Sequence, residues 1–290
     1  MAEQMDSLLQ EYRSGKITRR EFIQRAVVFT GSLAAAASVV DSLQPSLTYA
    51  AQVDLDDPAL LSAMVDFPGP AGTIFAYRSE PRASGSYPAI VVIHGNSGMT
   101  GYLQDVVRRL AKEGFVGLGV DYLSRKGGTA KVNATGGIES ISALAPQETV
   151  KEDTEAAVAY LRTLKEVRGD RIGIMGFCWG GGQAFYNATQ LSALRAVVVF
   201  YGRAPNPLDL VQRIGAPVLA HYGELDPRIT DQVPQVEAAM KKYNKPFEYK
   251  IYPKARHAFH SDESATNYNP EAAKEAWGRT VEFLKQKLQS

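Results

Sequence analysis

The stretch of sequence that decides the fold is Ile172-Gly173-Ile174-Met175-Gly176-Phe177-Cys178-Trp179-Gly180-Gly181-Gly182. Its apolar first half predicts a buried strand, and the residues from Gly180 onward can open a helix. The pattern Gly-x-Cys-x-Gly between them is typical of a strained strand-to-helix turn that carries a nucleophile. Residues two before and two after the nucleophile must lack bulk in such a turn, and Gly176 and Gly180 meet that need. The pattern therefore predicts that the Cys178 side chain projects above the edge of a sheet.

Cys178 is the only cysteine, so the chain can form no intrachain disulfide and no cysteine-based zinc cluster. A lone cysteine is usually a small buried hydrophobe. Here the sulfur is expected near a helix N-terminus, whose partial positive charge favours the thiolate. The backbone N–H of Trp179 is then positioned to donate to an oxyanion. We therefore predict that Cys178 is a nucleophile.

The rest of the chain alternates short apolar runs with helical patterns. Strands are predicted over Leu61–Phe67, Gly72–Tyr77, Ala89–Ile93, Phe115–Val120, Arg171–Met175, Ala196–Phe200, Pro217–His221 and Phe247–Tyr252. Helices are predicted over Tyr102–Glu113, Glu148–Leu164, Gly180–Thr189 and Asp231–Tyr243, and from the cap Asn269-Pro270 through Leu288. This order indicates an α/β protein whose mostly parallel central sheet carries helices on both faces. The Gly-rich stretch Ser124–Pro146 is predicted to be a long loop that forms a lid or a pocket wall.

A nucleophile of this kind needs a base, and the base needs an orienting acid. In this fold the order along the chain is nucleophile, acid, histidine. Asp226 lies in a turn just past the predicted strand Pro217–His221, where the acid belongs. His257 follows the strand Phe247–Tyr252, in the loop before the last helix, where the base belongs. The set Cys178, Asp226 and His257 is specific, whereas each member alone is a weak signal.

Each member of this set has an alternative nearby. Glu224 could serve as the acid in place of Asp226, and His260 could replace His257. If His260 is not the base, we expect it to be a solvated residue or one at the rim of the pocket. His221, at a strand end, is predicted to be structural.

A second oxyanion donor is expected from the loop after the strand Ala89–Ile93. This loop contains His94, Gly95, Asn96, Ser97, Gly98 and Met99. Its glycines allow the backbone to approach a ligand closely. The backbone N–H of Asn96 is the predicted donor. His94 is predicted to support the loop through hydrogen bonds rather than to transfer a proton.

With these motifs assembled, roughly residues 60–288 resemble the dienelactone hydrolase family of α/β-hydrolases. The resemblance extends over the strand-to-helix turn at Cys178, the His94–Gly98 loop, Asp121-Tyr122-Leu123-Ser124-Arg125 and Phe200-Tyr201-Gly202. It implies an α/β-hydrolase fold and a cysteine, aspartate and histidine triad at Cys178, Asp226 and His257. It also implies oxyanion donors on the backbones of Trp179 and Asn96.

The sequence departs from the family's founding members at two places. They place a glutamate that contacts the thiol where this chain has Gly95, so we predict a lower thiol pKa and easier oxidation here. They also hold the substrate carboxylate with arginines, one of them shortly after the catalytic histidine, and the stretch His257–Asp262 contains none. Arg125 and Arg256 lie nearby in sequence without a matching position. Tyr122 and Trp179 are candidates for the pocket wall or for core aromatics.

Composition excludes several other classes of protein. The 290 residues are 45% hydrophobic, with 32 basic and 31 acidic side chains and a net charge of +1. These values are typical of globular proteins and argue against a disordered chain, a collagen-like repeat or a coiled coil. The small net charge gives no electrostatic case for a nucleic-acid partner. Residues 51–290 contain no internal repeat and are predicted to form one domain.

The first fifty residues are predicted to be an export signal. Arg19-Arg20 precedes the uncharged, largely apolar run Ala26–Val40, which at 15 residues is too short for a bilayer that needs about 20. The arginine pair resembles the twin-arginine signal, which the export machinery recognises. A cleavage site could lie after Ala50, with Thr48 and Ala50 as the recognition residues. The alternative is an amphipathic helix packed on the body of the protein. Export predicts a periplasmic or extracellular hydrolase.

The predicted activity is hydrolysis of a lactone or small carboxylic ester through a cysteine thioester, with no metal or organic cofactor. Three alternatives remain. One is a hydrolase of peptides or larger polyesters, and another is a catalytically inactive, exported binding module of the same fold. The third is a thiol redox protein, which would normally need a second, resolving cysteine.

Overall fold

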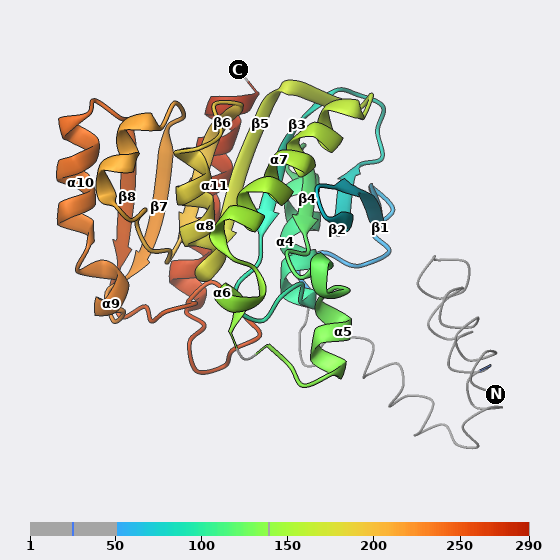
Figure 1. Cartoon of the computed structure of the whole chain (residues 1–290), viewed down its shortest axis with the longest axis horizontal. Helices are drawn as coiled ribbons and strands as arrows, with labels where there is room; N and C mark the ends of the chain where they lie inside the picture. Colours follow the sequence, from blue (N-terminus) through green and yellow to red (C-terminus); the bar gives the residue numbers. More distant parts are fainter. Residues whose placement is uncertain (1–24, 26–50, 139, 290) are drawn as a thin grey trace.

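The computed structural model describes residues 25, 51–138 and 140–289 (Figure 1). The twin arginines, the apolar run and the cleavage site after Ala50 lie outside the described residues, so the export signal stays a prediction. In the described part of the chain, no helix combines the length and the apolar character that crossing a membrane requires.

The centre of the described structure is an eight-stranded sheet in the order β1-β2-β4-β3-β5-β6-β7-β8. The strands are β1 (Leu60–Gly69), β2 (Gly72–Pro81), β3 (Tyr87–Ile93), β4 (Val116–Val120), β5 (Val167–Phe177), β6 (Leu194–Phe200), β7 (Val218–Gly223) and β8 (Phe247–Tyr252). β1 and β2 pair antiparallel, as do β2 and β4, and every other pair is parallel. The prediction of a mostly parallel sheet is confirmed.

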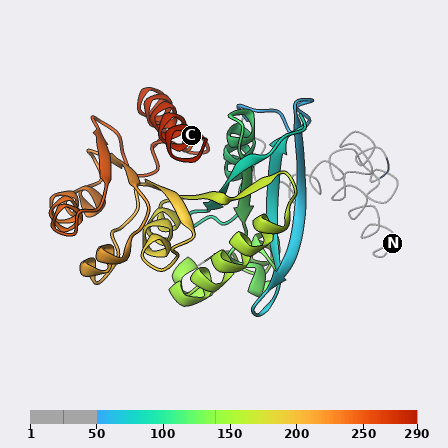
Figure 2. The same ribbon diagram turned by 90° about the horizontal axis from the view of Figure 1, so that it is seen from above.

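Helices cover both faces of this sheet, as Figure 2 shows for α4 and α11 against α7 and α8. The helices that pack on it are α4 (Gly101–Lys112), α7 (Gln147–Thr163), α8 (Trp179–Ala188), α10 (Val233–Lys242) and α11 (Pro270–Leu288). α4 and α11 share one hydrophobic core with the sheet, and α7, α8 and α10 share the other. The predicted cap of α11 is confirmed, because the Asn269 side chain accepts from the N–H of Ala272.

The two cores explain the continuous apolar run in β3. Ala89, Val91 and Ile93 belong to the core beneath α7, whereas Ile90 and Val92 belong to the core beneath α4. All five side chains are fully buried. Successive residues of a strand point to opposite faces, so a strand covered on both sides must be apolar at every position.

The prediction of a long loop over Ser124–Pro146 is wrong in part. This stretch contains the short elements η1 (Ser124–Lys126), α5 (Thr129–Ala134) and α6 (Ile141–Leu144). The sequence missed two further short elements, η2 (Leu208–Arg213) and α9 (Pro227–Thr230). Elements of three to six residues are too short to repeat a helical hydrophobic period, and tertiary contacts decide their conformation.

Candidate active site

Cys178 lies in a strained turn between β5 and α8. Its φ of 57° and ψ of −120° are unusual for a residue with a side chain and cost roughly 1–3 kcal/mol. A Cβ at Gly176 would come within 2.0 Å of the Gly180 carbonyl oxygen, and a Cβ at Gly180 within 2.3 Å of the His94 carbonyl oxygen. The steric need for both glycines is therefore confirmed.

Two loops from neighbouring strands bring His257 and Asp226 to this turn. His257 follows β8, and its Nε2 lies 3.0 Å from Cys178 Sγ. Asp226 follows β7, is almost fully buried, and its Oδ2 is hydrogen-bonded to His257 Nδ1. Glu224 instead accepts the backbone N–H of Lys254 at 2.8 Å. Of the two acids left open by the sequence, the structure brings Asp226 to His257.

The contacts of Cys178 and His257 favour a thiolate paired with an imidazolium. Burial raises the pKa of the Cys178 thiol, but His257 and the backbone N–H groups of Trp179 and Asn96 outweigh it and lower the pKa. Burial lowers the pKa of His257, but the contact with Cys178 and then that with Asp226 outweigh it and raise the pKa. The contact between Cys178 and His257 contributes to both shifts, because the opposite charges of thiolate and imidazolium stabilise each other.

The same two N–H groups are the predicted oxyanion donors. Trp179 begins α8, and Asn96 lies in the loop after β3; both line the cavity that contains Cys178.

His94 supports the loop after β3 through two hydrogen bonds. Its Nε2 accepts the backbone N–H of Tyr122 at 3.1 Å, so Nδ1 carries the proton and donates to the carbonyl oxygen of Gly95 at 2.8 Å. Burial lowers the pKa of His94 and keeps the ring neutral.

Gly95 faces Cys178 directly. A Cβ placed on it would lie 3.5 Å from the Cβ of Cys178, an ordinary van der Waals distance. A side chain at this position would therefore touch Cys178. The absence of one leaves Cys178 without a carboxylate from this loop.

The cavity at Cys178 has a volume of about 560 Å³. The predicted residues in its lining are Asn96, Cys178, Trp179 and His257. The sequence missed Arg203 and Arg228, which also line it, and no acidic side chain is part of the lining among the described residues. Arg203 follows β6 and Arg228 follows β7, so the sequence could have placed both at the carboxyl edge of the sheet, where ligands bind in open α/β sheets. Which loop residues at that edge face the cavity depends on the tertiary structure.

The remaining candidates for the pocket do not line this cavity. Tyr122 is buried and bonds Thr154 Oγ1 at 2.8 Å, so it is a core aromatic. Arg125 is turned toward the carboxylates of Asp153 and Glu152 on α7. His260 was expected to be solvated or at the rim, but it is buried, and its Nδ1 bonds the Tyr102 hydroxyl at 2.6 Å.

His221 and Arg256 also lie outside the cavity lining. His221 is structural, as predicted, because its ring nitrogens bond the hydroxyls of Tyr252 and Thr280 inside the protein. Burial lowers the pKa of His221 to about 3. Arg256 is exposed and lies outside the cavity lining.

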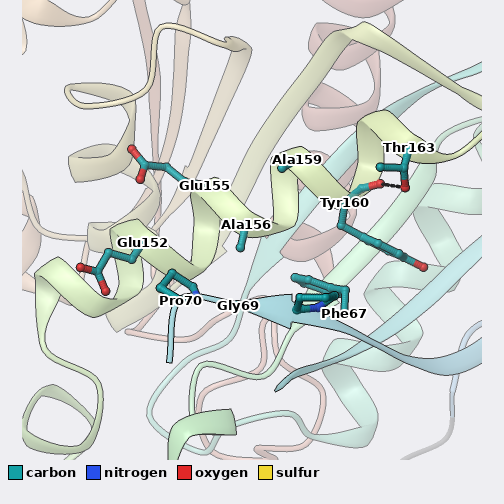
Figure 3. A pocket seen from close by; sticks show the side chains of 10 residues that line it. Phe67, Gly69, Pro70, Glu152, Glu155, Ala156, Ala159, Tyr160 and Thr163 are labelled. Carbon is teal, nitrogen blue, oxygen red and sulfur yellow. Dashed lines mark hydrogen bonds between the residues drawn. The ribbon is translucent and has the colours of Figure 1, made fainter. Parts of the chain in front are cut away.

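A second hollow, the α7 groove, lies between the turn that joins β1 to β2 and the helix α7 (Figure 3). It measures about 620 Å³, and its lining includes Phe67, Glu152, Glu155 and Tyr160. The rings of Phe67 and Tyr160 stack at 4.6 Å. The described lining of the groove contains no cysteine or histidine, so the larger hollow lacks the pair that marks the candidate active site.

The fold and the turn at Cys178 define an α/β hydrolase. Residues 74–288 match the sequence profile of the Dienelactone hydrolase family. The chain belongs to the dienelactone hydrolase family.

Individual relatives agree with this assignment. A Methylorubrum extorquens protein named as a candidate carboxymethylenebutenolidase is 31% identical over 274 residues, covering 91% of this chain and 92% of that protein. A Bradyrhizobium protein named as a candidate 2-oxo-3-(5-oxofuran-2-ylidene)propanoate lactonase is 36% identical over 221 residues, covering 72% and 88%. The crystal structure of a candidate dienelactone hydrolase from Klebsiella pneumoniae, 28% identical, superposes with a TM-score of 0.71 over 79% of this chain and 99% of that chain.

Proposed function

We propose that this protein hydrolyses a lactone or a small carboxylic ester through a thioester on Cys178. The observation that carries the proposal is the 3.0 Å contact between His257 Nε2 and Cys178 Sγ, in a cavity of about 560 Å³. Nucleophile, base and orienting acid form one hydrogen-bonded line, which is the arrangement that acyl transfer needs. Membership of the dienelactone hydrolase family supports the same class of reaction.

In the first half of the reaction, the Cys178 thiolate attacks the carbonyl carbon of the substrate. The carbonyl oxygen becomes an oxyanion that accepts from the N–H groups of Trp179 and Asn96, a contribution of roughly 3–4 kcal/mol per donor in comparable sites. The bond between carbon and the leaving oxygen then breaks, and the His257 imidazolium gives its proton to that oxygen. With a lactone substrate, the released alcohol stays attached to the acyl group.

In the second half, neutral His257 takes a proton from water, and the hydroxide attacks the thioester carbon. The C–S bond breaks, the sulfur leaves as thiolate, and the acid product departs. Asp226 stabilises the imidazolium that is present before the attack and forms again in the second half, through its contact with His257 Nδ1. No step calls on a group from outside this chain except substrate and water.

The charge of the cavity supports an anionic substrate. Arg203 and Arg228 are the charged side chains that the structure adds to the predicted set, and the described lining contains no acidic residue. Arg228 also lies 3.7 Å from Oδ1 of the buried Asp226 behind the lining. Guanidinium groups bind carboxylates through paired hydrogen bonds. The names of both curated relatives above describe lactone substrates that carry a carboxylate. We propose that Arg203 and Arg228 take the part of the family arginine that is missing after His257.

The test is hydrolysis of a short p-nitrophenyl ester and of a dienelactone by the full chain, beside Cys178→Ala. Loss of the nucleophile should reduce kcat by about 10⁵–10⁶-fold. Mass spectrometry of the quenched wild-type reaction should detect an acyl group on the single cysteine. Equal rates for the wild type and Cys178→Ala would contradict the thioester. A wild type that binds lactones without turning them over would favour the inactive binding module.

We also propose that residues 1–50 direct export by the twin-arginine route and that residues 51–290 form the mature hydrolase. The boundary is supported by contacts just beyond it, since the N–H groups of Gln52 and Val53 donate to the buried Asp105 carboxylate at 3.2 and 2.9 Å. Expression of the full chain with Arg19→Lys and Arg20→Lys should keep it in the cytoplasm, whereas the unaltered chain should be exported. Equal export of both would contradict the proposal.

A further inference from the structure

Tyr201 is held in a strained conformation beside the candidate base. It follows β6 directly, and its φ of 40° lies in the left-handed region, at a cost of roughly 1–3 kcal/mol. Its N–H donates to the carbonyl oxygen of His221 at 2.7 Å, which holds the backbone in place. Its ring meets the His257 imidazole at a centroid distance of 5.2 Å and an angle of 61°. Strain of this kind persists only where the surrounding structure requires it.

Tyr201 begins a buried chain of side-chain contacts. Its hydroxyl lies within hydrogen-bonding reach of Tyr102 on α4. The ring of Phe177 packs against both tyrosines, with centroid distances of 6.3 Å to Tyr201 and 5.6 Å to Tyr102. The Tyr102 hydroxyl bonds His260 Nδ1 at 2.6 Å. His260 lies three residues after His257 on the same loop. The side chains of Tyr201, Tyr102 and His260 are buried, so the chain links the end of β6, the helix α4 and the His257 loop inside the protein.

This chain stays uncharged. Burial raises the pKa of Tyr201, and the nearby charges of Cys178 and Asp262 raise it further. Burial lowers the pKa of His260 well below its usual value, and Arg109 and His221 act in the same direction. Neutral groups with fixed partners hold a geometry rather than switch it with pH. The chain therefore acts by holding side chains in position and not by gaining or losing a proton.

We propose that Tyr201, Tyr102 and His260 form a positioning brace, which keeps the His257 imidazole in line between Asp226 and Cys178. The ring of Tyr201 bounds the imidazole on one side, and the hydroxyl chain ties that ring to the loop that carries the imidazole. This inference rests on the proposed function of Cys178 and His257. Tyr102 and His260 lie outside the cavity lining and reach the reaction only through other residues.

The test compares Tyr102→Phe and Tyr201→Phe with Tyr77→Phe in the full chain. Tyr77 is the matched control, since its buried hydroxyl also makes a hydrogen bond, accepting from Arg108 Nη1 at 3.1 Å, but away from the brace. The first measurement is the pH dependence of alkylation by iodoacetamide. Because the chain has a single cysteine, this rate reports the Cys178–His257 pair without any substrate. The second is kcat and KM on the ester that the wild type hydrolyses best.

Both brace variants should move the midpoint of alkylation about half a pH unit upward, because a less well-held imidazole stabilises the thiolate less. They should lower kcat roughly 5- to 20-fold with KM changed less than about 2-fold. Since either substitution breaks the same chain, the double variant should be no slower than the slower single variant. Tyr77→Phe should lower thermal stability to a similar degree without either effect.

Three outcomes would overturn the brace. The first is a Tyr102→Phe variant whose alkylation midpoint and kcat equal those of the wild type. The second is a change in these two quantities that is equally large in Tyr102→Phe and in Tyr77→Phe. The third is additive effects in the double variant. If the wild type hydrolyses no ester, the proposed function fails, but the alkylation profiles still decide whether the brace positions His257.

Discussion

The cavity at Cys178 and the α7 groove differ little in volume, about 560 against 620 Å³, but differ in what lines them. The cavity is bounded by residues that follow the carboxyl ends of β3, β5, β6, β7 and β8. The groove is bounded by a helix face and by the turn between two antiparallel strands (Figure 3). Strand ends in a parallel sheet point loops and helix N-termini at one region, where side chains from distant segments and free N–H groups converge.

The two hollows also differ in charge. The cavity lining holds Arg203 and Arg228 without a carboxylate among the described residues, whereas the groove holds Glu152 and Glu155 beside the stacked rings of Phe67 and Tyr160. An anionic ligand would therefore be attracted to the cavity and repelled from the groove. Substitutions in the cavity should lower the rate of hydrolysis, whereas substitutions in the groove should lower the stability of the fold.

Among variants that keep Cys178, the largest effect on rate is expected from Asp226→Asn in the cavity. The substitution leaves His257 without its carboxylate partner, so kcat should fall about 10³–10⁴-fold on either substrate. Glu224→Gln is the matched control, because Glu224 contacts the backbone of Lys254 and not His257. Its kcat should stay within about 2-fold of the wild-type value, because a surface substitution away from the site usually has only a small effect. A comparable loss in both variants would restore Glu224 as a candidate acid.

The next effect is expected from removing the cavity's positive charge. Arg203→Ala should lower kcat/KM roughly 10-fold for a lactone that carries a carboxylate and less than 2-fold for a neutral ester. Arg228 also lies 3.7 Å from Asp226 Oδ1, so Arg228→Ala should slow the neutral ester as well. Arg256→Ala is the control for the loss of one positive charge, because Arg256 is exposed and lies outside the cavity lining. Equal losses on the neutral and the charged substrate in Arg203→Ala would argue against an anion site.

A smaller effect is expected from Gly95→Glu, which adds a carboxylate beside the nucleophile. A negative neighbour disfavours the thiolate, so the pKa of Cys178 should rise. The alkylation midpoint should move to higher pH, and the acidic limb of the kcat/KM profile should move with it. Gly95→Gln is the uncharged control of similar size. An identical shift in both variants would mean that bulk, not charge, controls the thiol.

The smallest effect on rate is expected from the α7 groove. Phe67 is buried, and Phe67→Ala removes its stack with Tyr160, so the free energy of unfolding should fall by roughly 3–5 kcal/mol. At a temperature where the variant is folded, kcat and KM should match the wild type. Thermal unfolding and ester hydrolysis on one preparation check both expectations. A large loss of kcat without a loss of stability would show that the comparison between the two hollows is mistaken.

Several local features of the fold could be predicted from the sequence. The strand Phe247–Tyr252 has the predicted bounds, and the cap at Asn269 begins the last helix as expected. Such features depend on neighbours within one or two turns of chain. Arg203 and Arg228 could not be assigned to the cavity, and His260 was expected at the surface. Their environments are made by other elements, so nothing within a few residues of them specifies whether they are buried or line a cavity.

The sequence by itself determined the alternation of strands and helices and the turn that carries Cys178. Hydrophobic period sets the first, and the two glycines satisfy the steric requirement of the second. Only the tertiary structure decided which acid meets His257, which arginines face the cavity and which tyrosine bounds the imidazole. His257 is 79 residues from Cys178 and 31 from Asp226 along the chain. Contacts over such separations exist only after the parallel strands have packed side by side and brought their carboxyl ends together.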